Sequence, residues 1–227
     1  MSIRWKIAQW FELRWWQRYF EGKNKAQYYG WKRKYWNDLL DKLADVLPLD
    51  SAKLIADLGC GPAGIFIVFG PQTPKGGFNT NEGETKVVAA DPLLNEYAAT
   101  LGFFDQKDFP YTTFVNQSLE DFSPAEKFDI VFCMNAINHV ADINRAYDKL
   151  VGAAKDGGSV VVSIDAHNHS FFKHLFRLVP GDILHPHQYD LEEYNGFLTS
   201  RGCTVTKTVL IKKEFFFSHY VVVAKLS

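Results

Sequence analysis

Cysteine is scarce in this chain of 227 residues, and its spacing excludes the sites that cysteine usually builds. The three cysteines, Cys60, Cys133 and Cys203, are widely separated and form no CxxC pair. A disulfide framework or a zinc site would need paired or closely spaced cysteines. We therefore interpret all three as reduced residues of the core or of loops.

Long apolar segments are also absent from the sequence. No stretch reaches the ~18 to 20 uncharged apolar residues that a membrane-spanning helix needs. The N-terminal residues do not follow the pattern of a secretory signal, because Arg4, Lys6, Glu12 and Arg14 interrupt every apolar run there. We expect a cytoplasmic protein, and the sequence leaves open whether it also attaches to the surface of a membrane.

Charge and tryptophan are distributed unevenly along the chain. Residues 1–36 hold nine Lys and Arg residues but only two Asp and Glu residues, whereas the whole chain has a formal charge of −1. All six tryptophans also fall in this first segment. We predict two units: an aromatic, basic helical cap over residues 1–36 and a larger domain over residues 37–227.

Short apolar runs and amphipathic segments alternate through the larger unit. Helical spacing predicts one helix from Asn37 that Pro48 stops, and another that Asp142 caps and Gly157-Gly158 end. Strands that alternate with helices indicate an α/β fold, a buried parallel sheet with helices on both faces. The predicted strands of this sheet are residues 53–58, 86–90, 112–115, 128–134 and 159–164.

The C-terminal part departs from a plain dinucleotide-binding pattern. A helix begins at Asp190, where Glu193 three residues later makes a capping-box-like opening. Two more strands, about 204–211 and 219–225, follow this helix and are joined by a short connection. They should therefore pair antiparallel.

The strongest functional signal is the glycine-rich turn that follows the first strand. A buried strand is followed here by three glycines, in the segment Ile55-Ala-Asp-Leu-Gly-Cys-Gly-Pro-Ala-Gly64. Glycines allow a sharp turn and the close approach of a ligand. Asp57 lies two residues before the first glycine, and Asp91 ends the next strand, where folds of this type hold ribose hydroxyls. The combination is more specific than a lone GxGxxG motif.

This constellation resembles motif I and the following acidic motif of class I (Rossmann-like) S-adenosylmethionine-dependent methyltransferases, in particular those that methylate small metabolites. The resemblance covers residues 37–227. It implies the sheet order 3-2-1-4-5-7-6 with the last strand antiparallel. It also implies S-adenosyl-L-methionine as the cofactor, S-adenosyl-L-homocysteine as the product and a small-molecule acceptor.

The resemblance also implies cofactor contacts for individual residues. The glycine loop would surround the methionine end, Asp91 would bind the ribose, and Asn135 would lie next to the sulfonium. Ser118 stands where many members of the family carry Asp beside the adenine. The residues implied to bind the cofactor are Asp57, Gly59, Cys60, Gly61, Gly64, Asp91, Pro92, Leu93, Ser118, Leu119 and Asn135.

Two other interpretations of the glycine loop stay open. A dehydrogenase also needs such a loop and an acid, but Pro62 replaces an open helix start here, and the sheet ends in a hairpin. A non-catalytic cofactor-binding or scaffold protein could keep the fold without turnover. Asp91 follows Gly64 by 27 residues, more than the ~20 usual in the dinucleotide-binding analogue. We attribute the excess to a polar surface loop at residues 70–84.

Histidines near strand ends are the candidate bases and acceptor-binding residues. An acceptor hydroxyl or protonated amine must lose a proton, and histidine titrates near neutrality. We predict His139 and His167 as catalytic residues, although His139 could instead hydrogen-bond its turn. His169, His185 and His187 are predicted to line the acceptor site, with structural roles and a metal site as alternatives. The known zinc spacings are absent, so we predict no metal.

The N-terminal segment allows three interpretations. It could form a lid over the pocket or a contact between copies, it could attach to a membrane surface, or it could bind RNA as the arm of an RNA-directed enzyme. Base-directed enzymes usually carry an Asn/Asp-Pro-Pro-aromatic motif after the fourth strand, where this chain has Asn135-Ala-Ile-Asn138. This difference disfavours a nucleic-acid substrate. Tyr29 and Trp36 are the residues of this segment that we expect near the acceptor, a small and aromatic or lipophilic metabolite methylated on oxygen or nitrogen.

Overall fold

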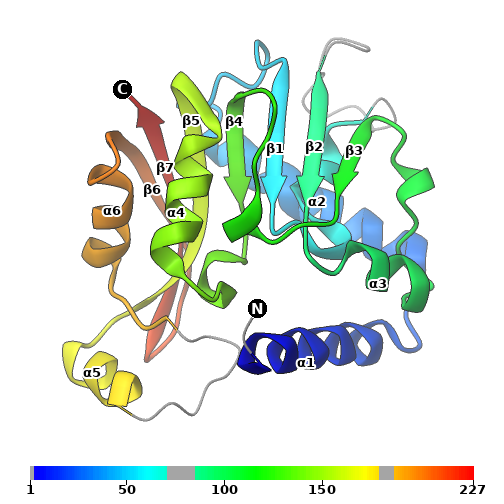
Figure 1. The fold of residues 1–227 in the computed structure, drawn as a ribbon, viewed down its shortest axis with the longest axis horizontal. Coiled ribbons are helices and arrows are strands. Elements are labelled where there is room, and N and C mark those ends of the chain that lie inside the picture. The colour runs from blue at the N-terminus through cyan, green and yellow to red at the C-terminus, as the bar shows by residue number, and fades with distance from the viewer. Residues whose placement is uncertain (1–2, 71–84, 179–186) are drawn as a thin grey trace.

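A seven-stranded sheet forms the centre of the protein in a computed structural model, which describes residues 3–70, 85–178 and 187–227 (Figure 1). The strand order is β3-β2-β1-β4-β5-β7-β6, which confirms the predicted order. The strands are β1 Leu54–Leu58, β2 Lys86–Ala90, β3 Thr112–Val115, β4 Phe128–Cys133, β5 Ala154–His167, β6 Cys203–Lys213 and β7 Phe217–Leu226.

The first five strands are parallel, and the hairpin that follows is antiparallel. β1 pairs with β2 and β4 in parallel register, with Asp57 opposite Ala89 on one side and Phe132 on the other. β7 runs antiparallel to both β5 and β6, as the short connection between the last two strands predicts. The carboxyl ends of β1, β2 and β4 therefore meet at one edge of the sheet, where open α/β folds bind ligands.

Helices cover both faces of the sheet and create two separate hydrophobic cores. One core receives buried side chains from α2 and α3, and the other receives them from α4 and α6. α1 and α5 lie at the lower edge of the sheet in Figure 1, on the side to which the parallel strands point. The helices are α1 Ile3–Phe20, α2 Lys25–Leu43, α3 Leu94–Thr100, α4 Ile143–Gly152, α5 Ser170–Leu178 and α6 Leu191–Thr199.

Two predicted helix boundaries are wrong, each for a local reason. The helix expected from Asn37 begins at Lys25, because the Asn24 side chain accepts a hydrogen bond from the Gln27 amide at 3.1 Å and caps it there. α4 ends at Gly152, before Gly157-Gly158. Those two glycines lie within β5, where Gly157 has φ +72° and the register between β4 and β5 shifts. They form a bulge, a second common use of glycine.

The predicted capping box is confirmed. The Asp190 side chain accepts from the Glu193 amide at 2.9 Å, and the Glu193 side chain accepts from the Asp190 amide at 3.0 Å. The three cysteines are free and buried. Within the described ranges, no helix combines the length and the apolar character that crossing a bilayer requires. Most of the polar segment predicted at residues 70–84 lies outside the described residues.

Candidate active site

The glycine loop begins where β1 ends and turns sharply across the edge of the sheet. Gly59 and Gly61 have φ angles of +72° and +55°, a region that side chains other than glycine rarely adopt. The Gly59 amide donates to the Ala90 carbonyl at 2.7 Å, which ties the loop to the end of β2. A Cβ atom on Gly59 would clash with that of Ala136. The backbone at this point therefore has room for no side chain.

Asp57 lies behind this loop, close to the end of β1. One carboxylate oxygen accepts a hydrogen bond from the Phe66 amide at 3.0 Å, and the other has no hydrogen-bond partner among the described residues. Burial raises the pKa of Asp57 to about 7, although hydrogen bonds and the charge of Lys32 oppose the shift. The site therefore holds an undercompensated carboxyl group, which would attract a cationic ligand group.

Asp91 holds the loop from the neighbouring strand. Its carboxylate accepts hydrogen bonds from the Gly61 amide at 2.9 Å and the Leu93 amide at 2.8 Å. Burial, and then the charge of Glu12, raise the pKa of Asp91 to about 7. Both acidic residues predicted from the sequence thus lie at the same edge of the sheet.

The opposite wall of the pocket comes from α1 and α2, and of its residues only Trp36 is predicted from the sequence. α1 contributes Gln9, Glu12 and Trp16, and α2 contributes Lys32 beside Trp36. Glu12 accepts a hydrogen bond from the Tyr97 hydroxyl at 3.0 Å, and burial raises its pKa. The four-residue spacing of Ala8, Glu12 and Trp16 is the signal that could have shown this face of α1.

Lys32 is a half-buried cation in this pocket. Its ammonium lies 4.4 Å from the centroid of the Trp36 ring, within the range of a cation–π interaction. Burial lowers the pKa of Lys32 to about 8, and the charge of Asp57 opposes the shift. The ammonium is therefore available to pair with an anionic ligand group near neutral pH.

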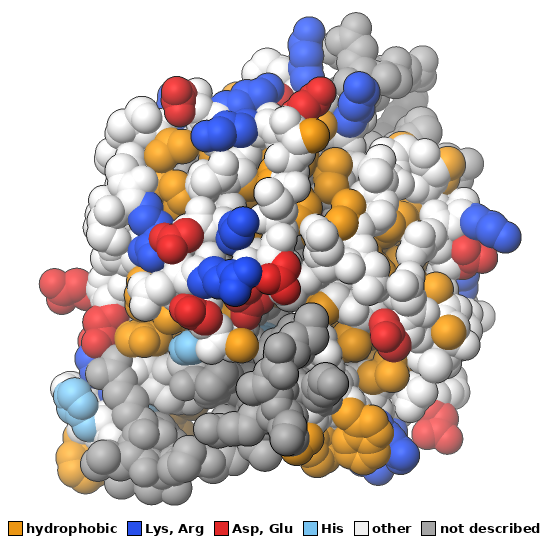
Figure 2. Space-filling view, viewed as in Figure 1, with side chains coloured by type: hydrophobic (Ala, Val, Ile, Leu, Met, Phe, Trp, Pro, Cys, Tyr) orange, Lys and Arg blue, Asp and Glu red, His pale blue; other side chains and the backbone are white. Residues whose placement is uncertain are grey.

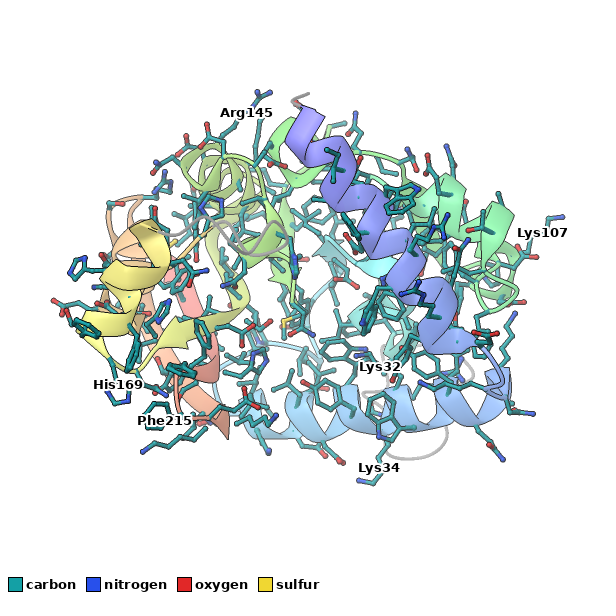
Figure 3. The ribbon with its side chains drawn as sticks, turned by 90° about the horizontal axis from the view of Figure 1, so that it is seen from below. Lys32, Lys34, Lys107, Arg145, His169 and Phe215 are labelled. Carbon is teal, nitrogen blue, oxygen red and sulfur yellow. The ribbon has the colours of Figure 1, made fainter. Side chains whose placement is uncertain are left out.

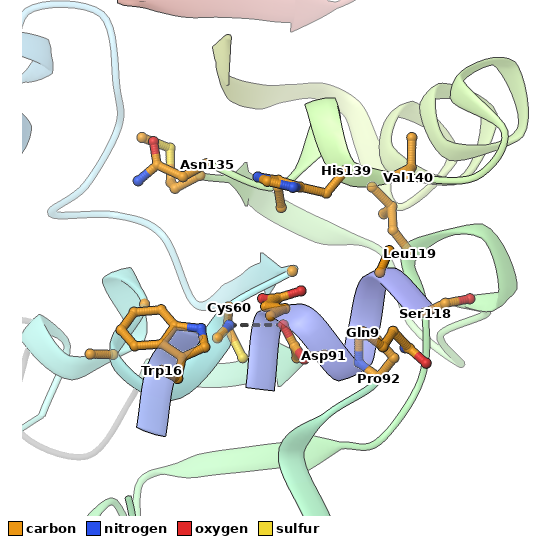
Figure 4. A pocket seen from close by; sticks show the side chains of 18 of the residues that line it. Gln9, Trp16, Cys60, Asp91, Pro92, Ser118, Leu119, Asn135, His139 and Val140 are labelled. Carbon is orange, nitrogen blue, oxygen red and sulfur yellow. Dashed lines mark hydrogen bonds between the residues drawn. The ribbon is translucent and has the colours of Figure 1, made fainter. Parts of the chain in front are cut away.

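The structure brings most of the predicted cofactor-binding residues into a single pocket (Figure 4). Asp57 and Leu93 do not line it but lie buried directly behind it. His139 and Trp36, predicted for catalysis and acceptor binding, share the pocket with them. The predicted cofactor residues in the lining are Gly59, Cys60, Gly61, Gly64, Asp91, Pro92, Ser118, Leu119 and Asn135.

Asn135 follows β4 in an unusual conformation. It has a φ of +55°, which makes it the one positive-φ residue other than glycine among those that the structure describes. Ser163 stabilises this turn, because its hydroxyl accepts from the Asn135 amide at 2.5 Å and donates to the Asn135 side chain at 3.1 Å. Strain of this kind often accompanies functional sites, and here it directs Asn135 into the pocket.

His167, predicted as a catalytic residue, and the other predicted acceptor residues that the structure describes are not part of the pocket lining. The Tyr29 hydroxyl donates to the Pro62 carbonyl at 3.0 Å, behind the glycine loop. His187 donates to the Val140 carbonyl at 2.7 Å, and His167 is hydrogen-bonded to Gln188 at 2.5 Å. His169 is exposed and packs against Phe215. His185 lies outside the described residues.

The pocket suits the cofactor that the resemblance implies. The glycine loop leaves space for a ligand, and Asp91 presents a carboxylate to the ribose of the cofactor. Asp57 and Lys32 supply opposite charges near the position of the cofactor's methionine end. Within the part of the chain that the structure describes, no group of His, Cys, Asp and Glu residues could hold a metal ion. Fold and site together define a Rossmann-like protein that binds a nucleoside cofactor at the carboxyl ends of parallel strands.

Comparison with known proteins identifies the family. The model of the methyltransferase domain family matches residues 28–208, and the chain belongs to this family. The predicted enzyme class, an S-adenosylmethionine-dependent methyltransferase, is thereby confirmed together with its cofactor.

Solved structures share the fold at low sequence identity. Magnesium protoporphyrin IX methyltransferase from Synechocystis PCC 6803, with bound S-adenosylhomocysteine, is 17% identical, with a TM-score of 0.58 over 96% of this chain and 95% of that one. The N-methyltransferase NodS from Bradyrhizobium japonicum WM9 is 14% identical, with a TM-score of 0.58 over 86% of this chain and 95% of that one.

A curated relative matches over a shorter segment. Ubiquinone biosynthesis O-methyltransferase from Bradyrhizobium sp. (strain ORS 278) is 31% identical over 107 residues, which represent 47% of this chain. The match spans 38% of the relative's length, well under half of that protein.

Proposed function

We propose that the enzyme transfers a methyl group to an oxygen or nitrogen atom of a small aromatic or lipophilic acceptor. The observation that carries this proposal is the helical wall of the pocket, where the half-buried Trp16 and the buried Trp36 line the cavity together with Lys32. Indole rings stack on planar ligands and bury apolar ones. The local similarity to an O-methyltransferase of ubiquinone biosynthesis supports an acceptor of this class.

The residues of the chain would align the acceptor and take up its proton. The bound cofactor supplies a methyl group on a positively charged sulfur. Asn135 and the glycine loop would position the reacting groups, and α1 would exclude water from them. His139, at the end of a short 3₁₀ turn in the pocket, is the residue that we propose as general base for a hydroxyl or amine.

The cofactor part of the proposal is tested by calorimetric binding of S-adenosylmethionine and S-adenosylhomocysteine. We expect micromolar binding to the wild type, and a loss of about thirtyfold or more in Asp91→Ala, because a buried, hydrogen-bonded carboxylate is worth about 2 kcal/mol or more. Glu96→Ala, an exposed change on α3, is the control. The absence of binding to folded wild-type protein would contradict the proposal.

The acceptor part is tested by measuring the release of S-adenosylhomocysteine with a panel of phenols, quinols and amines. We expect turnover with at least one aromatic acceptor, and a fall of about a hundredfold in kcat in His139→Gln with cofactor affinity unchanged. Turnover restricted to small aliphatic acceptors would contradict the proposed class. A His139→Gln variant as active as the wild type would remove His139 from the mechanism.

A further inference from the structure

The side of α1 that faces away from the pocket carries large apolar side chains in an exposed position. Their spacing of three and four residues places them along one side of the helix. Ala8, Glu12 and Trp16 follow the opposite side and line the pocket. The residues that line the pocket are half-buried, whereas the large apolar side chains on the outward side are exposed. The exposed residues are Ile7, Trp10, Phe11 and Trp15, each 41–52% accessible.

Positive charge accompanies these side chains. Arg14 and Arg18 are exposed on the same arc of the helix as Trp10 and Phe11, and the Arg14 guanidinium lies 4.5 Å from the centroid of the Trp10 ring. Glu12 is the one acidic residue of α1, and it is turned into the pocket. The outward surface of α1 is therefore aromatic and cationic, with no acidic group of its own helix to neutralise it.

A second exposed aromatic group lies at the tip of the β6–β7 hairpin and on α5. Phe215 and Phe171 are 68% and 73% exposed, and Phe216 is 38% exposed. Phe172 packs against Phe216 with ring centroids 4.9 Å apart, which joins α5 to the hairpin. The contact between α5 and the hairpin therefore keeps these rings on the surface of the protein.

The two groups lie on the same side of the molecule. α1, α5 and the tip of the hairpin are all at the lower edge in Figure 1. In Figure 3, seen from below, α1 crosses the face toward the viewer, with α5 and Phe215 at its left. Figure 2 shows hydrophobic side chains at both ends of this lower edge, on either side of residues that are not described.

We propose that this face docks on the surface of an anionic lipid bilayer. The aromatic rim comprises Ile7, Trp10, Phe11 and Trp15 on α1 together with Phe171, Phe215 and Phe216. Tryptophan and phenylalanine partition into the headgroup region of a bilayer, and each arginine near an anionic surface adds to the attraction. Arg14 and Arg18, exposed on α1 among these rings, give the rim the positive charge that complements anionic lipid.

Docking would also determine where the acceptor comes from. Because the inward side of α1 lines the pocket, a protein lying on its aromatic rim holds the pocket next to the bilayer. A lipid-soluble acceptor could then enter without crossing water. This last step rests on the proposed function, whereas the docking itself does not.

The test is sedimentation of the full chain with vesicles of phosphatidylcholine alone or mixed equally with phosphatidylglycerol. We expect binding to the mixed vesicles that weakens with salt, and much weaker binding to phosphatidylcholine. The double variant Trp10→Ser/Trp15→Ser should weaken binding roughly tenfold or more, and Phe215→Ser/Phe216→Ser should also weaken it. The control is Trp31→Ser, an equally exposed tryptophan on α2, which should bind as the wild type does.

Two further measurements separate docking from the alternatives. Brominated lipid should quench the tryptophan fluorescence of the wild type, and the quenching should fall in the Trp10→Ser/Trp15→Ser variant. Calorimetric binding of S-adenosylhomocysteine by each variant shows independently that the fold and cofactor site are intact. No binding to mixed vesicles, binding that the rim variants do not change, or a dimer that the same variants dissociate would overturn the proposal.

Discussion

The two walls of the pocket are built in different ways. The sheet-side wall consists of backbone turns and short side chains at the ends of β1, β2 and β4, and its positions follow from the register of neighbouring strands. The helical wall consists of long side chains on α1 and α2, namely Glu12, Trp16, Lys32 and Trp36. The sheet-side wall is therefore determined by local backbone geometry, and the helical wall by how two helices pack.

The electrostatics of the two walls are linked as well. Asp91 on the sheet side and Glu12 on α1 each raise the pKa of the groups around them, and burial raises both of their own pKa values. Lys32 on α2 interacts with Asp57 behind the glycine loop. Lys32 and Asp57 therefore compensate each other across the pocket, whereas Glu12 and Asp91 repel each other, and variants on either wall can test both effects.

The largest effect is expected from Gly59→Val on the sheet-side wall. The new side chain would need a positive φ and would clash with Ala136. Together these should lower the free energy of unfolding by about 3 kcal/mol and abolish measurable cofactor binding. Urea unfolding and calorimetry provide the two readouts. Binding within threefold of the wild type would show that the loop is not the rigid wall described above.

Gly30→Ala is the matched control on the helical wall. Gly30 lies within α2 with nothing within 4 Å of an added Cβ. Alanine should raise the free energy of unfolding by about 0.5 to 1 kcal/mol, because it favours the helix, and should leave cofactor binding unchanged.

A smaller effect is expected from Lys32→Met. If the Lys32 ammonium pairs with the carboxylate at the methionine end, the variant should bind S-adenosylhomocysteine about tenfold more weakly but 5′-methylthioadenosine, which lacks that carboxylate, equally well. Wild-type affinity for S-adenosylhomocysteine should also decline above pH 8, where Lys32 loses its proton. Calorimetry with Lys34→Met, an exposed change on α2, is the control. Equal losses for both ligands would refute the pairing.

The smallest effect is expected from Glu12→Gln, and it depends on pH. A carboxyl group whose folded pKa is raised stabilises the protein at low pH, and this stability is lost as pH rises through the folded value, about 7 for Asp91. Wild-type stability without ligand should therefore fall between pH 5 and pH 8. Glu12→Gln removes one such group and lowers the pKa of Asp91.

The free energy of unfolding of Glu12→Gln should accordingly exceed that of the wild type by about 1 kcal/mol at pH 8. At pH 5 the two values should differ little. Urea unfolding at both pH values measures this difference, and Glu21→Gln at the exposed end of α1 should show none. A Glu12→Gln variant less stable than the wild type at pH 8 would mean that the hydrogen bond to Tyr97 outweighs the repulsion from Asp91.

α4 and α1 show how far helix patterns can be interpreted from sequence. α4 has one apolar side, with Ile143, Tyr147 and Leu150 buried against the sheet, and its position could be predicted from spacing alone. α1 has two apolar sides, one in the pocket and one exposed, so its residues do not separate into a polar and an apolar arc. The pattern therefore does not show that Glu12 and Trp16 face the pocket.

The histidines show the same limit for the site. His139 ends the short 3₁₀ turn that follows β4, so its place at the pocket follows from the end of a strand. His167 and His187 are also near strand or helix ends, but the chain beyond β5 turns away and gives them partners in Gln188 and Val140. Position in the sequence therefore does not show whether a histidine near the end of a strand reaches the pocket.

The resemblance to class I methyltransferases implies the strand order, and the sequence patterns alone predict the parallel sheet, its terminal hairpin and the glycine loop with Asp57 and Asp91. These features depend on short-range signals: buried apolar runs, positive-φ glycines and acids at strand ends. The placement of α1 and α2 beside that edge, with Glu12 and Lys32 near the two acids, emerges only from the packing of the whole chain. Such contacts join residues dozens of positions apart, and their geometry depends on the packing of whole helices rather than on any local preference of the chain.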